Sequence, residues 1–104
     1  MVHEIVITIT ALKDLKAAIE WYNKKDTTIG IRLINNFEIS IEKLKSNPEI
    51  YTLIANNVRG IEIAKFPYKI IYYLNTNREV IIIGIVHIKR SDAFVRKKLK
   101  ESKI

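Results

Sequence analysis

Six basic side chains occupy positions in the second half of the chain from which they could form one site. They are Arg59, Lys65, Lys69, His87, Lys89 and Arg90. Lys65 and Lys69 flank a turn-forming Phe-Pro-Tyr sequence, whereas the last three of the set follow a long apolar run. Because neighbouring strands pair side by side, we expect these two groups to meet at one end of a sheet.

A cluster of this kind has the chemistry of a metal-free RNA endonuclease. One group removes the 2′-hydroxyl proton, and Arg or Lys stabilises the negative charge that develops on the phosphate. His87 can act as acid or base because imidazole changes charge near neutral pH. Tyr68, Tyr72 or Tyr73 could stack on a base. The simpler alternative is that strand ends are polar and solvated in any protein, and that tyrosines on a sheet are packing residues.

Other kinds of chemistry lack a signal in the sequence. Neither His3 nor His87 has a second histidine or a carboxylate at ligand spacing, so we expect no metal and no cofactor. The three glycines are scattered and form no phosphate loop. With no cysteine, the chain has no disulfide framework, thiolate metal site or nucleophilic thiol.

Positive charge is concentrated at the C-terminal end. The net charge of the 104 residues is +7, and the last sixteen residues hold seven Lys or Arg side chains, Arg96 among them, against Asp92 and Glu101. Such a patch suits a polyanion or an acidic protein partner, although a solvated tail has the same composition.

The hydrophobic pattern predicts the elements that position these residues. Alternation predicts strands, and apolar residues at steps of three and four predict helices. Asn47-Pro48 ends the second helix, and the apolar run from Val80 to Val86 indicates a central strand buried on both faces. The predicted order is a strand over 2–9, a helix capped by Thr10 that ends near 24–26, a helix over 28–46, a loop over 49–57, and strands over 58–65, 66–74 and 79–88.

We therefore expect one α+β domain over residues 1–104, with the order β-α-α-β-β-β(-α). The two helices form a hairpin on one face of a small, mostly antiparallel sheet. Ser91 or Asp92 could cap a short helix in the basic tail, residues 91–104. The longest apolar run is far shorter than the ~20 residues of a membrane span, and residues 1–10 do not read as a signal peptide. A cytoplasmic protein without a membrane partner is expected.

Several sequence features, in order, resemble the RelE/ParE superfamily of type II toxin–antitoxin toxins over residues 4–95. They are Asp14-Leu15 and Trp21-Tyr22, Asn47-Pro48, Val58-Arg59, Phe66-Pro67-Tyr68-Lys69-Ile70-Ile71-Tyr72, and Ile85-Val86-His87-Ile88-Lys89-Arg90. The resemblance implies a small toxin that arrests growth when it is released from an antitoxin. The resemblance also implies that the antitoxin is encoded by an adjacent gene and that an acidic or amphipathic segment of it folds across the toxin.

The superfamily has two branches with different targets. ParE-like members poison DNA gyrase, whereas RelE-like members cleave mRNA on the ribosome. The Phe66-Pro67-Tyr68 element and the His87-x-x-Arg90 pattern favour the ParE-like branch, with target-binding residues Arg59, Lys65, Tyr68, Lys89, Arg90 and Arg96.

In the RelE-like alternative the catalytic residues would be Lys69, His87 and Arg90, but Ala93 and Phe94 stand where a catalytic tyrosine is expected. A third alternative is an inactive or orphan toxin fold that binds nucleic acid.

Overall fold

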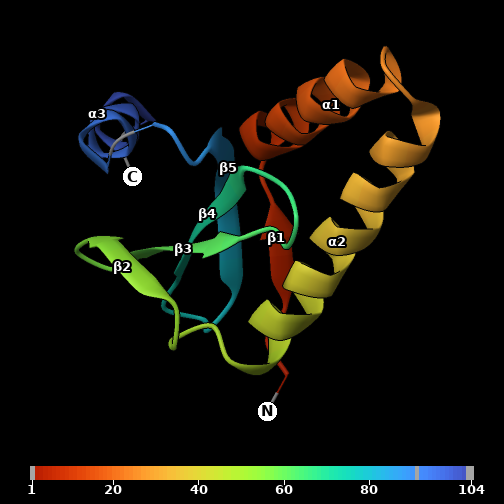
Figure 1. The fold of residues 1–104 in the computed structure, drawn as a ribbon. Helices are drawn as coiled ribbons and strands as arrows, with labels where there is room; N and C mark the ends of the chain where they lie inside the picture. Colours follow the sequence, from red (N-terminus) through yellow and green to blue (C-terminus); the bar gives the residue numbers. More distant parts are fainter. Residues whose placement is uncertain (1, 91, 103–104) are drawn as a thin grey trace.

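The computed structural model describes residues 2–90 and 92–102. Within these residues the chain has an α+β fold with the element order β-α-α-β-β-β-β-α (Figure 1). They are β1 (Ile5–Ile7), α1 (Ile9–Asn23), α2 (Thr27–Ser46), β2 (Thr52–Ala55), β3 (Val58–Glu62), β4 (Tyr68–Leu74), β5 (Val80–His87) and α3 (Asp92–Ser102). No helix in the described part of the chain is long and apolar enough to cross a membrane.

The strands form one mixed sheet in the order β1-β5-β4-β3-β2. β1 runs parallel to β5, and the other neighbours are antiparallel, as expected for a mostly antiparallel sheet. β5 lies between β1 and β4, which confirms it as a central strand. An irregularity opposite Ile71 and Tyr72 shifts the alternation of β5, so that Ile82 and Ile85 face one side of the sheet and Ile83 and Val86 face the other. Both faces of β5 are therefore apolar.

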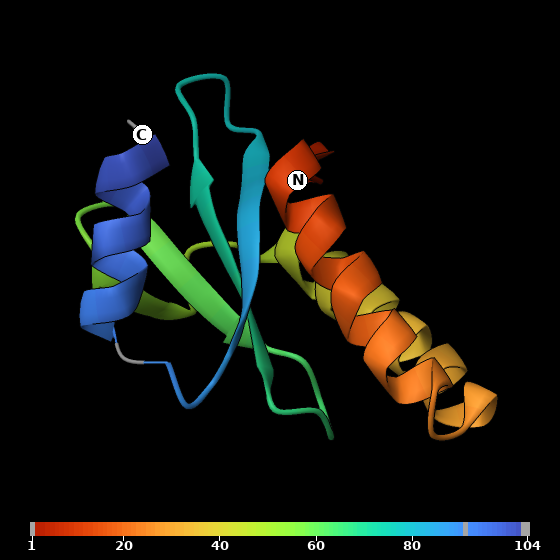
Figure 2. The ribbon, with the colours of Figure 1, turned by 90° about the horizontal axis from the view of Figure 1, so that it is seen from above.

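The antiparallel hairpin of α1 and α2 covers one face of the sheet, as predicted (Figure 2). Its core-facing residues include Leu15 on α1 and Leu33 and Phe37 on α2, which pack against a cluster containing Ile70 and Tyr72 of β4. The Tyr72 hydroxyl is buried in this layer and donates a hydrogen bond of 2.6 Å to the carbonyl of Pro48. The chain is thereby fixed where α2 ends.

α3 lies on the opposite face of the sheet, so helices cover both faces rather than one (Figure 2). Val95 of α3 is buried with Ile54 of β2, Val58 of β3 and Ile71 of β4. Within the basic tail, Asp92–Ser102 thus forms the helix that the sequence indicates. The predicted cap stays a prediction, because the residue before the helix, Ser91, lies outside the described residues.

The sequence prediction of a loop over 49–57 is wrong, because Thr52–Ala55 forms β2. This four-residue edge strand pairs with β3, and the register shifts between Leu53 and Ala55. So short a run has too few residues for alternation to be recognised, and pairing with β3 is what stabilises it. Other predicted strands are shortened: 2–9 to Ile5–Ile7, 58–65 to Val58–Glu62, and 66–74 to Tyr68–Leu74.

The cap of α1 is Thr8 rather than Thr10. The Thr8 hydroxyl accepts a hydrogen bond from the N–H of Ala11 at 3.2 Å and donates one to the carbonyl of Ile82 at 2.8 Å. Thr8 therefore joins the end of β1, the start of α1 and the middle of β5. Sequence alone favoured Thr10 because the strand pattern continues to Ile9.

We expect Thr8→Ala to lower the free energy of unfolding by about 1–2 kcal/mol, the usual cost of a lost helix cap. Urea denaturation monitored by circular dichroism measures the loss. Thr10→Ala is the matched control, because Thr10 is exposed in the first turn of α1, and its expected effect is within about 0.5 kcal/mol. A larger loss for Thr10→Ala than for Thr8→Ala would contradict the cap.

Candidate functional site

The start of β4 and the end of β5 meet at one end of the sheet. Tyr68 lies opposite His87, and Lys69 lies opposite Val86. The N–H of Ile88 donates to the carbonyl of Pro67 at 2.9 Å, so the pairing continues one step beyond the strands. Strand pairing therefore brings together the Phe-Pro-Tyr turn and the polar residues that follow β5.

Aromatic rings form a continuous row at this end of the sheet. The rings of Tyr68 and His87 are 5.6 Å apart edge to face, and Tyr22 of α1 lies 6.4 Å from Tyr68 and 4.8 Å from Trp21. Burial, with a smaller effect of Tyr22, raises the pKa of Tyr68 above its ordinary value. The Tyr68 phenol therefore stays protonated and remains a hydrogen-bond donor at neutral pH.

The residues after β5 form a tight turn that presents positive charge. The N–H of Lys89 donates to Nδ1 of His87 at 3.1 Å, and the N–H of Arg90 donates to the His87 carbonyl at 2.9 Å. With Nδ1 accepting, the proton of a neutral His87 ring lies on Nε2. The Arg90 guanidinium lies 4.8 Å from the centre of the Phe94 ring, and Lys89 and Arg90 are both exposed.

Lys69 points to the other face of the sheet from His87. Its ammonium lies 3.9 Å from the carboxylate of Asp92 at the start of α3. Its aliphatic stem lies over Gly60, where a Cβ would come within 2.6 Å of the Lys69 side chain. Gly60 thus leaves the space in which Lys69 lies. The three residues of the endonuclease alternative, Lys69, His87 and Arg90, are consequently divided between the two faces.

Two other predicted residues lie away from this end of the sheet. Arg59 donates to the carbonyl of Tyr51 at 2.7 Å, and Arg96 donates to the carbonyl of Ile54 at 3.3 Å. Arg59 thereby links β3, and Arg96 links α3, to the segment around β2. The Arg96 contact therefore helps to hold α3 in place. Five of the predicted residues do lie at this end of the sheet, and we name them the strand-end cluster. They are Lys65 in the turn before β4, Tyr68, His87, Lys89 and Arg90.

α1 contributes residues to this region that the sequence motifs did not assign to the site. A hollow of about 480 Å³ lies between α1 and the ends of β4 and β5, and Asp14, Trp21 and Tyr22 are among its lining residues, with Tyr68 and His87. Trp21 is 53% exposed, and the ammonium of Lys25 lies 4.7 Å from its ring centre. A large apolar residue such as tryptophan beside the polar face of an amphipathic helix indicates an exposed contact surface, and this signal is readable from the sequence.

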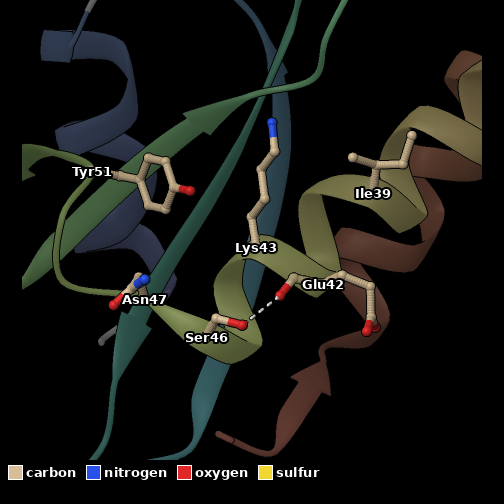
Figure 3. A pocket seen from close by; sticks show the side chains of 6 residues that line it. All are labelled: Ile39, Glu42, Lys43, Ser46, Asn47 and Tyr51. Atoms are coloured by element: carbon tan, nitrogen blue, oxygen red, sulfur yellow. Dashed lines mark hydrogen bonds between the residues drawn. The ribbon is translucent and has the colours of Figure 1, made fainter. Parts of the chain in front are cut away.

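A second hollow, at the C-terminal end of α2, contains none of the predicted site residues. It measures about 400 Å³ and lies between α2 and Tyr51 (Figure 3). Glu42 and Lys43 border it, and the Ser46 hydroxyl makes a 3.5 Å hydrogen bond to the Glu42 carbonyl. Within residues 2–90 and 92–102, no three His, Asp or Glu side chains gather as a metal site would require.

Comparisons with known proteins give a family from the sequence and a similar fold from a solved structure. A family model described as the ParE toxin of the type II toxin–antitoxin system parDE matches residues 5–92. A chain in a solved structure of the chromosomal ParDE TA system from P. aeruginosa is similar with a TM-score of 0.72 and 14% sequence identity, over 83% of this chain and 96% of that chain. At that identity the likeness concerns the fold. No curated protein matches the sequence significantly.

Proposed function

Because the chain belongs to the ParE toxin family of type II toxin–antitoxin systems, we propose that it arrests growth by poisoning DNA gyrase. The family membership carries the toxin function, and gyrase is the proposed target. In this proposal the toxin binds gyrase while gyrase holds cleaved DNA, so that the DNA break persists.

The observation that carries this proposal is the strand-end cluster. Lys65, Lys89 and Arg90 are exposed cations, and Tyr68 and His87 form an aromatic surface beside them. Exposed cations grouped in this way favour encounter with a negatively charged target, and a gyrase–DNA complex carries the phosphates of its DNA. Arg90 can also bind a carboxylate or phosphate with two parallel hydrogen bonds.

The arrangement of the cluster favours gyrase poisoning over mRNA cleavage. General acid–base cleavage requires the acid, the base and the charge-stabilising group within hydrogen-bond reach of one phosphodiester. Lys69 and His87 lie on opposite faces of the sheet, and Lys69 is near Asp92. A binding surface needs no such convergence, so the same residues suit recognition of a macromolecule.

We further propose that a cognate antitoxin, encoded by an adjacent gene, holds the toxin inactive. The net charge of +7 favours a partner that contributes carboxylates. A disordered acidic segment that folds on binding would cover a large surface of so small a toxin.

Purified toxin with gyrase, ATP and supercoiled plasmid tests the target. We expect linear plasmid after the protein is removed, and we expect this product to disappear when the antitoxin is added first. A reaction without gyrase is the control, because a contaminating nuclease would cut the plasmid whether or not gyrase is present. Intact plasmid from a toxin preparation that still arrests growth would contradict the proposal and direct the search to ribosome-dependent mRNA cleavage.

A further inference from the structure

A hollow of about 310 Å³ lies at the end of the sheet opposite the strand-end cluster. Arg78, in the loop between β4 and β5, and Arg59 of β3 both line it, together with Glu49 of the loop after α2. The loop between β4 and β5 and the C-terminal end of β5 lie at opposite ends of the sheet (Figure 1). The length of β5 therefore separates the two cationic regions by roughly 25 Å, at about 3.3 Å per residue. We name the hollow with Arg59 and Arg78 the arginine pocket.

The backbone holds Arg78 in a conformation that side chains rarely adopt. Its φ angle is +64°, in the left-handed region, and in a short hairpin loop that place usually belongs to glycine. The N–H of Arg78 donates to the Asn75 carbonyl at 3.0 Å, and Nδ1 of His3 donates to the Arg78 carbonyl at 2.8 Å. A long cationic side chain is therefore fixed at a position that local backbone preferences disfavour.

The Glu49 carboxylate demonstrates that an anion fits beside Arg78. It accepts a hydrogen bond from the Arg78 guanidinium at 2.9 Å. That bond, together with the positive charges of Arg78, Arg59 and His3, holds the pKa of Glu49 below its ordinary value. The side chains of the pair are 58% and 55% exposed, and an ion pair so exposed contributes little to stability. An external anion can therefore replace Glu49 without loss of the fold.

Further hydrogen-bonding groups line the hollow. The Arg59 guanidinium, which donates to the Tyr51 carbonyl at 2.7 Å, carries five N–H donors, of which that bond uses one. Asn56 and Asn57, in the turn between β2 and β3, are exposed at the hollow, and asparagine amides donate readily to phosphate oxygens. Two guanidinium groups and two amides on one hollow match the oxygens of a phosphodiester.

We propose that the arginine pocket binds a backbone phosphate of a nucleic acid, which displaces Glu49 from Arg78. A phosphate is favoured over a partner's carboxylate because Glu49, on the same chain, is a carboxylate at high effective concentration. A nucleic acid gains further free energy from release of the counterions condensed on its phosphates, and the net charge of +7 favours its approach. The DNA that gyrase holds is the expected source, and only this choice of DNA rests on the proposed function.

Fluorescence anisotropy of a labelled twenty-base-pair DNA duplex, titrated with purified toxin at several salt concentrations, tests the phosphate contact. We expect Arg78→Asn to raise the Kd at least about fivefold and to lower the salt dependence by about one counterion, because one phosphate contact is lost. Asparagine tolerates the left-handed backbone of Arg78. Thermal unfolding verifies the fold, and Arg78→Gly serves as a second variant. Lys16→Asn, at an exposed position of α1 that does not line the hollow, is the charge-matched control and should change the Kd by less than about twofold.

Glu49→Gln tests the displacement. It should lower the Kd at least about threefold, because the competing carboxylate is lost while the shape of the side chain is kept. Glu20→Gln, on the exposed side of α1, removes the same charge elsewhere and measures the general effect of charge. In the Arg78→Asn background, Glu49→Gln should have no larger effect than Glu20→Gln, because the bond for which Glu49 competes is gone. A gain as large in that background as in the wild type would overturn the displacement.

The remaining outcomes decide the ligand. Unchanged binding of Arg78→Asn to the duplex and to a single-stranded RNA of the same length would overturn the inference. An effect on the duplex assigns the pocket to DNA, whereas an effect on the RNA alone retains the phosphate site and overturns DNA as its ligand. Normal binding of both nucleic acids with loss of antitoxin affinity would overturn the inference by assigning the pocket to an acidic protein. The nucleic-acid titrations contain no gyrase, so their failure leaves the proposed target to the plasmid assay.

Discussion

Replacing Phe37 with alanine is expected to lower the free energy of unfolding by about 3–5 kcal/mol, the range measured for truncating a buried phenylalanine. Phe37 is 6% exposed and lies between α2 and the sheet in the larger apolar cluster. Truncation removes its burial and leaves a cavity that a close-packed interior fills only in part. For a domain whose total stability is about 5–15 kcal/mol, that is a large fraction. Equilibrium urea denaturation measures the change, and growth arrest should be lost together with folding.

Ile39→Ala is the control for this prediction. Ile39 is two residues further along α2 but 50% exposed, so its truncation should change the free energy of unfolding by less than about 1 kcal/mol. A soluble Phe37→Ala protein with wild-type unfolding behaviour would show that the core-facing side of α2 is assigned incorrectly.

Arg90→Ala is expected to abolish growth arrest while the protein stays folded. The guanidinium is exposed after β5, and its described contact is with the Phe94 ring, an interaction that contributes about 0.5–1 kcal/mol at exposed sites. Loss of this side chain therefore removes a charge-assisted contact to the target at little cost in stability. Inducible expression without antitoxin measures growth arrest, and thermal unfolding measures stability.

Lys43→Ala is the charge-matched control for Arg90. Lys43 is exposed near the C-terminal end of α2. Two residues later, the backbone carbonyl of Lys45 accepts a hydrogen bond from the N–H of His3, which precedes β1. That contact places Lys43 toward the end of the sheet where β1 begins, away from the strand-end cluster. The control protein should arrest growth fully. Full toxicity of Arg90→Ala itself would mean that the strand-end cluster is not the target-binding surface.

Much of the fold could be predicted because its strongest signals are local. The α2 pattern is long and periodic and ends at Asn47-Pro48, and the structure places its end at Ser46. The run from Val80 to Val86 correctly predicts a central strand, because burial on both faces demands apolar residues at odd and even positions. The sequence does not predict β2, because four residues carry too little pattern. It does not predict the cap at Thr8 either, because the second partner of Thr8, Ile82, is distant in sequence.

For the candidate site, the sequence by itself determined which basic residues are present. It also determined that Tyr68 stands at the start of one strand and His87 at the end of the next, so that pairing of these two strands brings their ends together. These properties depend on residue type and on the order of the elements. Only the tertiary structure decided which face each side chain occupies. Neighbouring positions on a strand point to opposite faces, so Lys69 lies near α3 while Tyr68, one residue earlier, lies toward α1.

The tertiary structure also decided how α1 takes part. Asp14 reaches the Ile85 N–H over a separation of 71 residues, and no local pattern encodes the angle at which α1 leaves β1. That angle results from packing Leu15 and Ala18 against the sheet. At this angle α1 leaves a hollow beside the edge of β5. The sequence alone does not give the angle, because helix packing is determined by the summed shape of many side chains from distant parts of the chain.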